Sequence, residues 1–403
     1  DVYKRQLMIR SGTQVTGDII NSSKKLRIIG RAGVGVDNVD VKAATQKGVL
    51  VVNSPGGNTI AAAEHTIAMM LALSRNIPIA NSSTFLGKWE RKKFVGNELF
   101  KKKLGVVGLG KIGTHVAKVA NALGMDVYGY DPFVSSERAQ QLQVRLSELK
   151  TLFEESDYVT LHLPRTSETE NLVDMKVLKS MKKNAKLINC ARGGIIDEEA
   201  LAEALNNSLI GGAAIDVFSE EPLDSNSPLL KVDKNLILTP HLGASTNEAQ
   251  ENVGIEIARN VRNFLVNGTI INSVNTPSVD SKTAQLLKPY LQLAEGMGKM
   301  LSQIASKGNE SLNIKYSGKV ADLDTSLITR SALKGYLERA CGEESVNYIN
   351  APGVAEKLGI TVSETRPTDE TEFTELIEIE TSNEWQSLST DQTNYAVWIG
   401  HAT

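Results

Sequence analysis

Short apolar runs alternate with helix-like stretches along the chain from Leu7 to about Val274. Helix-like stretches such as residues 60–75 and 111–124 lie between the apolar runs. Alternation of strands and helices is typical of an α/β fold, in which helices cover parallel sheets. After a first strand over residues 7–10, the runs that predict strands are LRIIG, GVLVVN, KLGVVG, MDVYGYD, YVTLHL, KLINC, GGAAIDVF and NLILTP.

The alternation falls into two units, each expected to hold a doubly wound parallel sheet. The second unit begins near Leu104 and ends near His241, and a helix over residues 245–266 is expected to return the chain to the first. This pattern predicts a discontinuous first domain over residues 1–75 and 245–273, and a second domain over residues 76–244.

The pattern changes after Asn275. The segment NTPSVDSK is typical of a linker, and a helix over residues 285–305 and strand-like runs at 312–318 and 374–381 are expected after it. We predict a separate α+β domain over residues 274–403, whose last segment, 385–403, has no clear period.

Composition and charge narrow the class of protein. The chain has 403 residues, is 41% hydrophobic and carries a formal charge of −3, which does not suggest a nucleic-acid or membrane partner. No apolar run approaches the roughly 18 residues of a membrane span. Two cysteines do not form a disulfide framework and favour a reducing cytoplasm.

One glycine-rich loop has a specific physical interpretation. Residues 108–113, GLGKIG, follow a predicted strand and open a predicted helix. Gly108 allows the tight turn, Gly110 lets a pyrophosphate approach the backbone, and Gly113 lets the helix pack on the strand. Asp131 ends the next strand, where its carboxylate accepts hydrogen bonds from a ribose and repels a 2′-phosphate. The loop therefore predicts a Rossmann-like domain that binds NAD rather than NADP.

Side chains that can do chemistry follow several predicted strands. Ligands of open parallel sheets bind beyond the carboxyl ends of the strands, so these side chains are expected at one edge. Hydride transfer from an alcohol needs a base for the hydroxyl proton and a cation for the substrate carboxylate. The strand ends supply Pro164, Arg192, Asp216, Glu221 and His241.

Each of these residues also has a structural interpretation. His241 could bind only backbone, Glu221 could be an ordinary acid before a proline, and Arg192 could form a structural ion pair. No metal site is predicted. The remaining histidines are interpreted as structural: His65 on a helix face, His115 on the outside of the helix after the glycine loop, His162 packed in a strand and His401 in the irregular tail.

The chain resembles the D-isomer-specific 2-hydroxyacid dehydrogenase family, and most of all its phosphoglycerate branch. The resemblance covers residues 7 to 273, roughly two thirds of the chain. It rests on the segments GRAGVGVDNVD, NSPGGNTIAAAEHT, GKWERKKFVGNEL, GVVGLGKIG, NCARGGIIDEEAL, AIDVFSEEP and PHLGASTNEAQ.

The resemblance implies roles for matching positions. Arg192 would bind the substrate carboxylate and polarise the C2 oxygen, His241 would be the acid–base, and Glu221 would hold its imidazole. Arg10 and Arg31 would bind substrate, chiefly its phosphate, and Arg91 would reach the site of a partner subunit. The positions implied to contact NAD, besides the glycines of the loop, Asp131 and Pro164, are Val34, Lys111, Ile112, Cys190, Ala191, Asp216, Gly243 and Ala244.

Residues 274 to about 380 resemble the intervening regulatory domain of the longer bacterial enzymes. KYSGKVADLDTSLITRSALKGYLE and VNYINAPGVAEKLGI carry this second resemblance. Members of the family begin with a further strand and helix and end with a serine-binding ACT domain. Neither is found in this sequence, which leads us to expect a piece of a longer protein.

The predicted activity is oxidation of D-3-phosphoglycerate by NAD to 3-phosphohydroxypyruvate, the first step of L-serine biosynthesis. A cytoplasmic homodimer or homotetramer is expected. Two alternatives stay open: a glyoxylate or hydroxypyruvate reductase of the same family, and an NAD-binding regulatory protein on the same fold. Arg10 and Arg31 favour the phosphorylated substrate, and the presence of Arg192, Glu221 and His241 together disfavours a protein that only binds.

Overall fold

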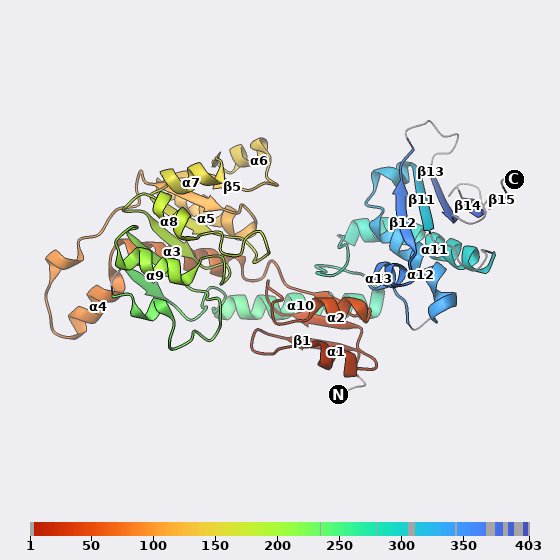
Figure 1. Cartoon of the computed structure of the whole chain (residues 1–403), viewed down its shortest axis with the longest axis horizontal. Coiled ribbons are helices and arrows are strands. Elements are labelled where there is room, and N and C mark those ends of the chain that lie inside the picture. Colours follow the sequence, from red (N-terminus) through yellow and green to blue (C-terminus); the bar gives the residue numbers. More distant parts are fainter. Residues whose placement is uncertain are drawn as a thin grey trace. The chain divides into compact units, whose positions relative to one another are not determined.

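The computed structural model describes residues 4–233, 235–279, 281–304, 311–342, 345–367, 375–381, 386–390 and 398–401. The chain forms two compact units (Figure 1). One comprises Asp1–Pro55 with Val253–Thr403, and the other comprises Gly56–Asn252.

The second unit is built on a seven-stranded sheet in which every neighbouring pair is parallel. Eight apolar residues of three central strands are fully or almost fully buried, because both faces of the sheet are covered. All the strands predicted between residues 103 and 240 are confirmed, and only the two-residue β6 was missed. The strand order is β10 (Leu236–Leu238), β9 (Gly212–Ile215), β8 (Lys186–Asn189), β7 (Tyr158–Leu161), β4 (Lys103–Val107), β5 (Asp126–Tyr130) and β6 (Arg145–Leu146).

Helices cover both faces of this sheet. Leu187 of β8 faces a core shared with α7, α8 and α9, whereas its neighbour Ile188 faces a core shared with α3 and α5. The two-residue alternation explains why the strands appear as continuous apolar runs. The helices of this unit are α3 (Thr59–Ser74), α4 (Ile77–Phe85), η1 (Arg91–Phe94), α5 (Lys111–Ala122), α6 (Ser136–Gln141), α7 (Leu149–Glu155), α8 (Met175–Ser180), α9 (Glu198–Asn206) and η2 (Pro228–Lys231).

The boundary of this unit differs from the one we expected. The compact unit begins at Gly56 rather than after residue 75. Helix α3 accounts for the difference, because its buried Met70 and Leu73 pack in one core with Leu104 and Val106 of β4. Apolar periodicity identified the helix but not the sheet that it covers.

The first segment of the other unit carries a smaller parallel sheet. Its order is β1 (Gln6–Ile9), β2 (Ile28–Arg31) and β3 (Leu50–Val52), with the short helices α1 (Gly17–Ser22) and α2 (Val41–Gln46) between the strands. Helix α10 (Asn247–Asn267) packs Ile257 and Val261 against β2 and β3. The expected return of the chain to the first sheet is therefore confirmed.

Gly30 shows how closely α10 approaches this sheet. A Cβ atom at Gly30 would lie 2.8 Å from Cγ1 of Ile257 and 2.9 Å from Cγ2 of Val261. A larger residue at this position of β2 would push the helix away from the strand.

The C-terminal part of the same unit is α+β, as predicted. Its five-stranded sheet is parallel only between β12 and β11. The last segment was expected to be irregular, and this was wrong: β14 and β15 add to the sheet by antiparallel pairing. Residues 391–397 of this segment lie outside the described part. The elements are α11 (Ser281–Ile304), β11 (Ser311–Gly318), η3 (Lys319–Asp322), α12 (Ser326–Cys341), α13 (Ala351–Lys357), β12 (Thr361–Thr365), β13 (Glu375–Thr381), β14 (Gln386–Thr390) and β15 (Trp398–His401).

Two glycines allow α11 and α12 to cross at short range. A Cβ at Gly298 would lie 2.1 Å from the carbonyl oxygen of Ala332, and one at Gly335 would lie 2.1 Å from that of Glu295. Hydrophobic residues of both helices then share one core with β11 and β13.

Among the described residues, no helix combines the length and the apolarity needed to cross a bilayer.

Candidate active site

The histidine and glutamate predicted at the sheet edge are paired. Nδ1 of His241 lies 2.7 Å from Oε2 of Glu221. His241 follows β10 with a left-handed backbone at φ +54, and Glu221 lies in the loop after β9. Both residues lie at the carboxyl-end edge of the sheet, as predicted, because β9 and β10 are parallel neighbours.

The local charges shift the pKa of both groups in opposite directions. The hydrogen bond to Glu221 raises the pKa of His241, while burial and the nearby Arg192 oppose the rise. Burial pushes the pKa of Glu221 upward, but hydrogen bonds from His241 and from the Phe218 N–H outweigh it, and the pKa falls. The pair is therefore an imidazole with increased affinity for a proton, held by an ionised carboxylate.

Arg192 lies in the loop after β8, close enough to His241 to act on its charge. Asn189 Nδ2 donates to the Arg192 carbonyl at 2.9 Å, and Arg192 Nη1 donates to the Ala191 carbonyl at 2.6 Å. A Cβ at Gly193 would lie 1.7 Å from the Phe218 carbonyl oxygen. Glycine after the arginine therefore lets the loop after β8 pack directly on the loop that carries Glu221.

The glycine loop has the geometry that its sequence predicts. Gly108 adopts φ +95, and a Cβ at Gly113 would lie 1.9 Å from the Gly108 carbonyl oxygen, so α5 packs tightly on the turn. A Cβ at Gly110 would meet nothing within 4 Å. The backbone at Gly110 therefore faces open space at the N-terminus of α5, where a dinucleotide pyrophosphate fits.

Asp131 is tied to this loop. Its Oδ2 accepts from the Leu109 N–H at 2.8 Å and its Oδ1 accepts from the Phe133 N–H at 2.9 Å. The carboxylate thus holds the turn of the glycine loop against the end of β5. Its contact with a ribose stays a prediction, as do the contacts of Pro164, Lys111, Ile112, Ala191 and Ala244 with NAD.

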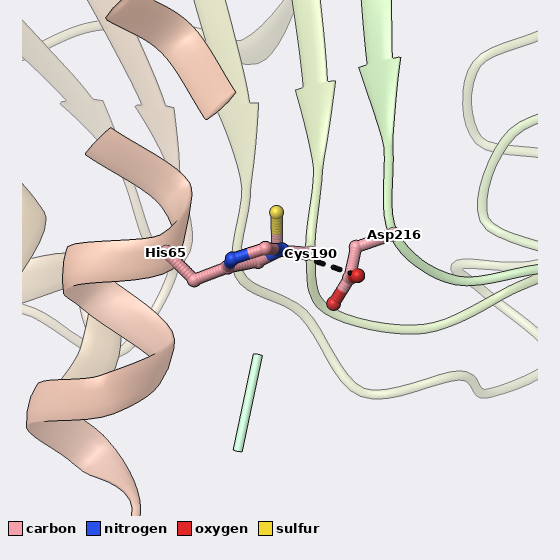
Figure 2. A group of neighbouring side chains, drawn as sticks. All are labelled: His65, Cys190 and Asp216. Carbon is pink, nitrogen blue, oxygen red and sulfur yellow. Dashed lines mark ion pairs between the residues drawn. The ribbon is translucent and has the colours of Figure 1, made fainter. Parts of the chain in front are cut away.

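Asp216 is the centre of a buried network that the sequence did not reveal. Its Oδ1 accepts from the Thr239 hydroxyl at 2.5 Å and from the Leu242 N–H at 2.8 Å, and its Oδ2 accepts from the Gly243 N–H at 2.9 Å. His65 of α3, which we expected to be an ordinary helix-face residue, lies 3.1 Å from the same Oδ1 (Figure 2). No signal in the sequence pointed to this contact between α3 and the residue that follows β9.

Cys190 lies beside this network. His65, Cys190 and Asp216 carry donor atoms within 4.8 Å of one another, as in a small metal site (Figure 2). Burial raises the pKa of the Cys190 thiol to about 12, which opposes the thiolate that metals bind. Asp216 is already satisfied by hydroxyl and backbone donors. A hydrogen-bonded network explains these contacts without a metal.

The remaining histidines match their structural interpretation only in part. His162 directly follows β7, and its Nε2 lies 3.1 Å from the Thr160 hydroxyl. Burial lowers the pKa of His162 to about 4, so its ring is neutral beneath the glycine loop. His115 is half-buried on α5, and His401 belongs to β15 rather than to an irregular tail.

In the other unit, the two predicted phosphate-binding arginines come from neighbouring strands. Arg31 ends β2 and pairs in register with Ile9 of β1, so Arg10 follows at the same sheet edge. A Cβ at Gly33 would lie 1.5 Å from Nη1 of Arg31, so glycine leaves room for the guanidinium. The carbonyl of Val34, another predicted contact, accepts from Asn53 Nδ2 at 2.6 Å.

Arg91 lies elsewhere, on an arm of the second unit formed by α4 and residues 86–97. Figure 1 shows the arm reaching out from the body of this unit. Phe85, Trp89 and Val95 of the arm are 84%, 82% and 79% exposed. The structure places Arg91 in η1 of this arm.

Comparisons with known proteins agree with this geometry. Residues 67–243 match the family model "D-isomer specific 2-hydroxyacid dehydrogenase, NAD binding domain", and residues 286–395 match "D-3-phosphoglycerate dehydrogenase intervening domain". A solved D-lactate dehydrogenase from Aquifex aeolicus, complexed with NAD and lactic acid, is similar with a TM-score of 0.62 and 28% identity, over 69% of this chain and 89% of that one.

Several similar curated proteins are named D-3-phosphoglycerate dehydrogenase. The protein from Synechocystis sp. is 52% identical, over 89% of this chain and 65% of the relative. The protein from Archaeoglobus fulgidus is 46% identical, over 93% of this chain and 70% of the relative. The protein from Bacillus subtilis is 42% identical, over 96% of this chain and 73% of the relative. The chain spans about two thirds of the length of these relatives. With a doubly wound NAD-binding domain, a paired histidine and glutamate at its edge and these relatives, the chain belongs to the D-3-phosphoglycerate dehydrogenase family of D-isomer-specific 2-hydroxyacid dehydrogenases.

Proposed function

We propose that the protein oxidises D-3-phosphoglycerate to 3-phosphohydroxypyruvate with NAD, the first step of L-serine biosynthesis. The observation that carries this proposal is the 2.7 Å pair of His241 and Glu221, with Arg192 acting on the same imidazole. The relatives named D-3-phosphoglycerate dehydrogenase support the choice of substrate.

His241 removes the proton of the C2 hydroxyl through Nε2, because Nδ1 is engaged by Glu221. Arg192 binds the C1 carboxylate with its planar guanidinium, for which a point-charged lysine is no equivalent. Arg192 also stabilises charge on the C2 oxygen as the proton leaves. When bound, the nicotinamide supplies the acceptor for the hydride that leaves C2 as the C2=O bond forms. Arg10 and Arg31 bind the phosphate.

NAD would be held chiefly by the second unit. The open backbone at Gly110 and the N-terminus of α5 suit its pyrophosphate, and Asp131 favours a ribose without a 2′-phosphate. The further positions proposed to contact it are Val34, Gly108, Lys111, Ile112, Gly113, Pro164, Cys190, Ala191, Asp216, Gly243 and Ala244.

The activity test is the appearance of NADH absorbance when the protein receives NAD and D-3-phosphoglycerate. Glyoxylate and hydroxypyruvate with NADH test the alternative substrates of the same family in the reductive direction. Tight binding of NADH without turnover of any of the three would support the NAD-binding regulatory protein instead. Turnover of phosphoglycerate well above that of the unphosphorylated acids is the result expected here.

A homodimer or homotetramer in the cytoplasm completes the proposal. The exposed apolar side chains of the arm are better suited to a partner subunit than to water. A partner on the arm would bring Arg91 toward the other subunit's site. Cys190 and Cys341 are free thiols, in keeping with a reducing compartment. The domain over residues 274–403 is proposed to be regulatory, because most of it matches the intervening domain.

A further inference from the structure

The loop that carries His241 is held by Asp216 immediately after the histidine. Leu242 and Gly243, the two residues that follow His241, both donate their backbone N–H groups to the Asp216 carboxylate, at 2.8 and 2.9 Å. His241 itself has φ +54, a left-handed conformation that is unfavourable for a residue with a side chain. Such a conformation persists only where its surroundings hold it, and here the Asp216 carboxylate does so.

The Asp216 carboxylate can hold the backbone of Leu242 and Gly243 only if the carboxylate itself is held in place. Its side chain is fully buried, and a buried carboxylate is stable only when it is paired and hydrogen-bonded. The backbone of the loop supplies two donors, and the Thr239 hydroxyl supplies a third. All three belong to residues 239–243, so they tie this loop to Asp216 at the end of β9, and they leave the carboxylate without a donor from a further element.

His65 supplies that further donor from α3. Its Nε2 lies 3.1 Å from Oδ1 of Asp216 and 3.3 Å from the Thr239 hydroxyl, and its side chain is 19% exposed. Because a carboxylate only accepts hydrogen bonds when ionised, Nε2 of His65 is the donor in this contact. His65 extends from α3 (Figure 2). Met70 and Leu73 of the same helix are buried in a core shared with β4.

We propose that His65 is a positioning residue for catalysis, which acts through Asp216 to hold residues 239–243 and so to aim the His241 imidazole at the reacting C2 hydroxyl. This inference rests on the proposed function for its catalytic consequence. The structural part of the proposal is that His65 restrains the backbone at Leu242 and Gly243. This part does not depend on which substrate is used.

The test compares His65→Leu, which removes the donor, with His65→Gln, whose amide can still donate to Asp216. His115→Leu on α5 is the matched control. Hydrogen–deuterium exchange of the full chain reports on the amides of Leu242 and Gly243 without any turnover. We expect exchange of this segment to speed up by about tenfold in His65→Leu, equivalent to about 1.4 kcal/mol of lost protection, and to stay near wild type in the other two.

Kinetics then separate positioning from simple loss of folded protein. For His65→Leu we expect kcat to fall by about 10- to 100-fold while KM for D-3-phosphoglycerate stays within about threefold. With substrate deuterated at C2, the isotope effect on kcat should rise in His65→Leu, because a misaimed base slows the chemical step. A variant that was merely less folded would lose rate without changing the isotope effect, and His65→Gln should restore both values.

Several results would overturn the proposal. Wild-type exchange at Leu242 and Gly243 in His65→Leu would show that His65 restrains nothing there. Loss of turnover in EDTA, restored by Zn²⁺, would make His65 and Asp216 metal ligands instead. If His65→Leu did not fold, Thr239→Val, which removes another donor to the same Oδ1, takes its place in the exchange test, and unchanged exchange would again refute the network. If wild type did not oxidise phosphoglycerate, the proposed function would fail while the exchange data still decided the role of His65.

Discussion

At the residue scale, the neighbours of His241 set the proton affinity of its imidazole and the ring nitrogen that stays available. Glu221 occupies Nδ1 of His241, which leaves Nε2 for the substrate. Arg192 approaches the same imidazole from the loop after β8 and opposes the rise in its pKa. Two side chains, from the strand ends after β9 and β8, therefore shift the pKa of the imidazole that follows β10.

Arg192→Lys tests the guanidinium. Lysine keeps the charge but loses the fork that binds a carboxylate through two parallel hydrogen bonds, so kcat should fall by about 10²–10³-fold. Steady-state turnover of D-3-phosphoglycerate measures this, with Arg138→Lys on the exposed helix α6 as the control. Near-normal turnover of Arg192→Lys would remove Arg192 from the reaction.

Glu221→Gln tests the pKa of His241. Oxidation needs a neutral imidazole, so kcat/KM for phosphoglycerate should rise as the pH passes upward through the pKa of His241. Glu221 raises that pKa, so its loss should move the rise to lower pH. The pH profiles of wild type, Glu221→Gln and the neighbouring Glu220→Gln measure the shift. Identical profiles in all three would mean that His241 is not the titrating base.

At the scale of elements, close backbone packing between loops positions the residues of the candidate site. The loops after β8 and β9 touch at Gly193, and the turn between β4 and α5 closes through Gly108 and Gly113. Asp131 links the same turn to the end of β5. These contacts lie between parallel neighbours of the sheet, where the strand ends of one unit meet.

Gly193→Ala tests the contact between the two loops. A Cβ only 1.7 Å from the Phe218 carbonyl oxygen forces backbone to move, so both kcat and the melting temperature should fall, the latter by several degrees. Gly254→Ala in α10 is the matched control, because its Cβ meets nothing within 4 Å. There alanine should stabilise the helix by about 0.5–1 kcal/mol. Equal melting temperatures and turnover for Gly193→Ala and wild type would contradict the packing argument.

Asp131→Ala tests the joint between the glycine loop and β5. Loss of the acceptor for the Leu109 N–H and of the proposed ribose contact should raise KM for NAD by about tenfold and narrow the preference over NADP. The KM values for both cofactors measure this, with Asp126→Ala at the exposed start of β5 as the control. If neither KM changed, Asp131 would lie away from the cofactor.

At the scale of the whole molecule, the arm is the feature least explained within one chain. Phe85 and Trp89 are more than four-fifths exposed on an element that reaches out from its unit (Figure 1). Water-exposed side chains of this size gain roughly 1.5–3 kcal/mol each when a partner buries them. We therefore propose that a partner subunit covers the arm, which carries Arg91.

Phe85→Ser combined with Trp89→Ser should weaken the oligomer and lower turnover together. Light scattering coupled to size-exclusion chromatography, over a range of micromolar concentrations, measures the mass. Phe133→Ser serves as the control, because Phe133 is 95% exposed but lies outside the arm. An unchanged mass and turnover in the double variant would separate the arm from assembly.

Local pattern predicted most strands and helices of the second unit, the glycine loop and the polar residues at the strand ends. Strands buried on both faces appear as apolar runs, and a parallel sheet brings their carboxyl ends to one edge, so local pattern was enough to place His241, Glu221 and Arg192 at that edge. Their catalytic roles stay predictions. Only the tertiary structure assigned α3 to the second unit, added β14 and β15 to the C-terminal sheet and joined His65 to Asp216. Each of these depends on packing or pairing with residues distant in sequence, and periodicity along the chain carries no information about which distant partner a helix face or a polar strand will meet.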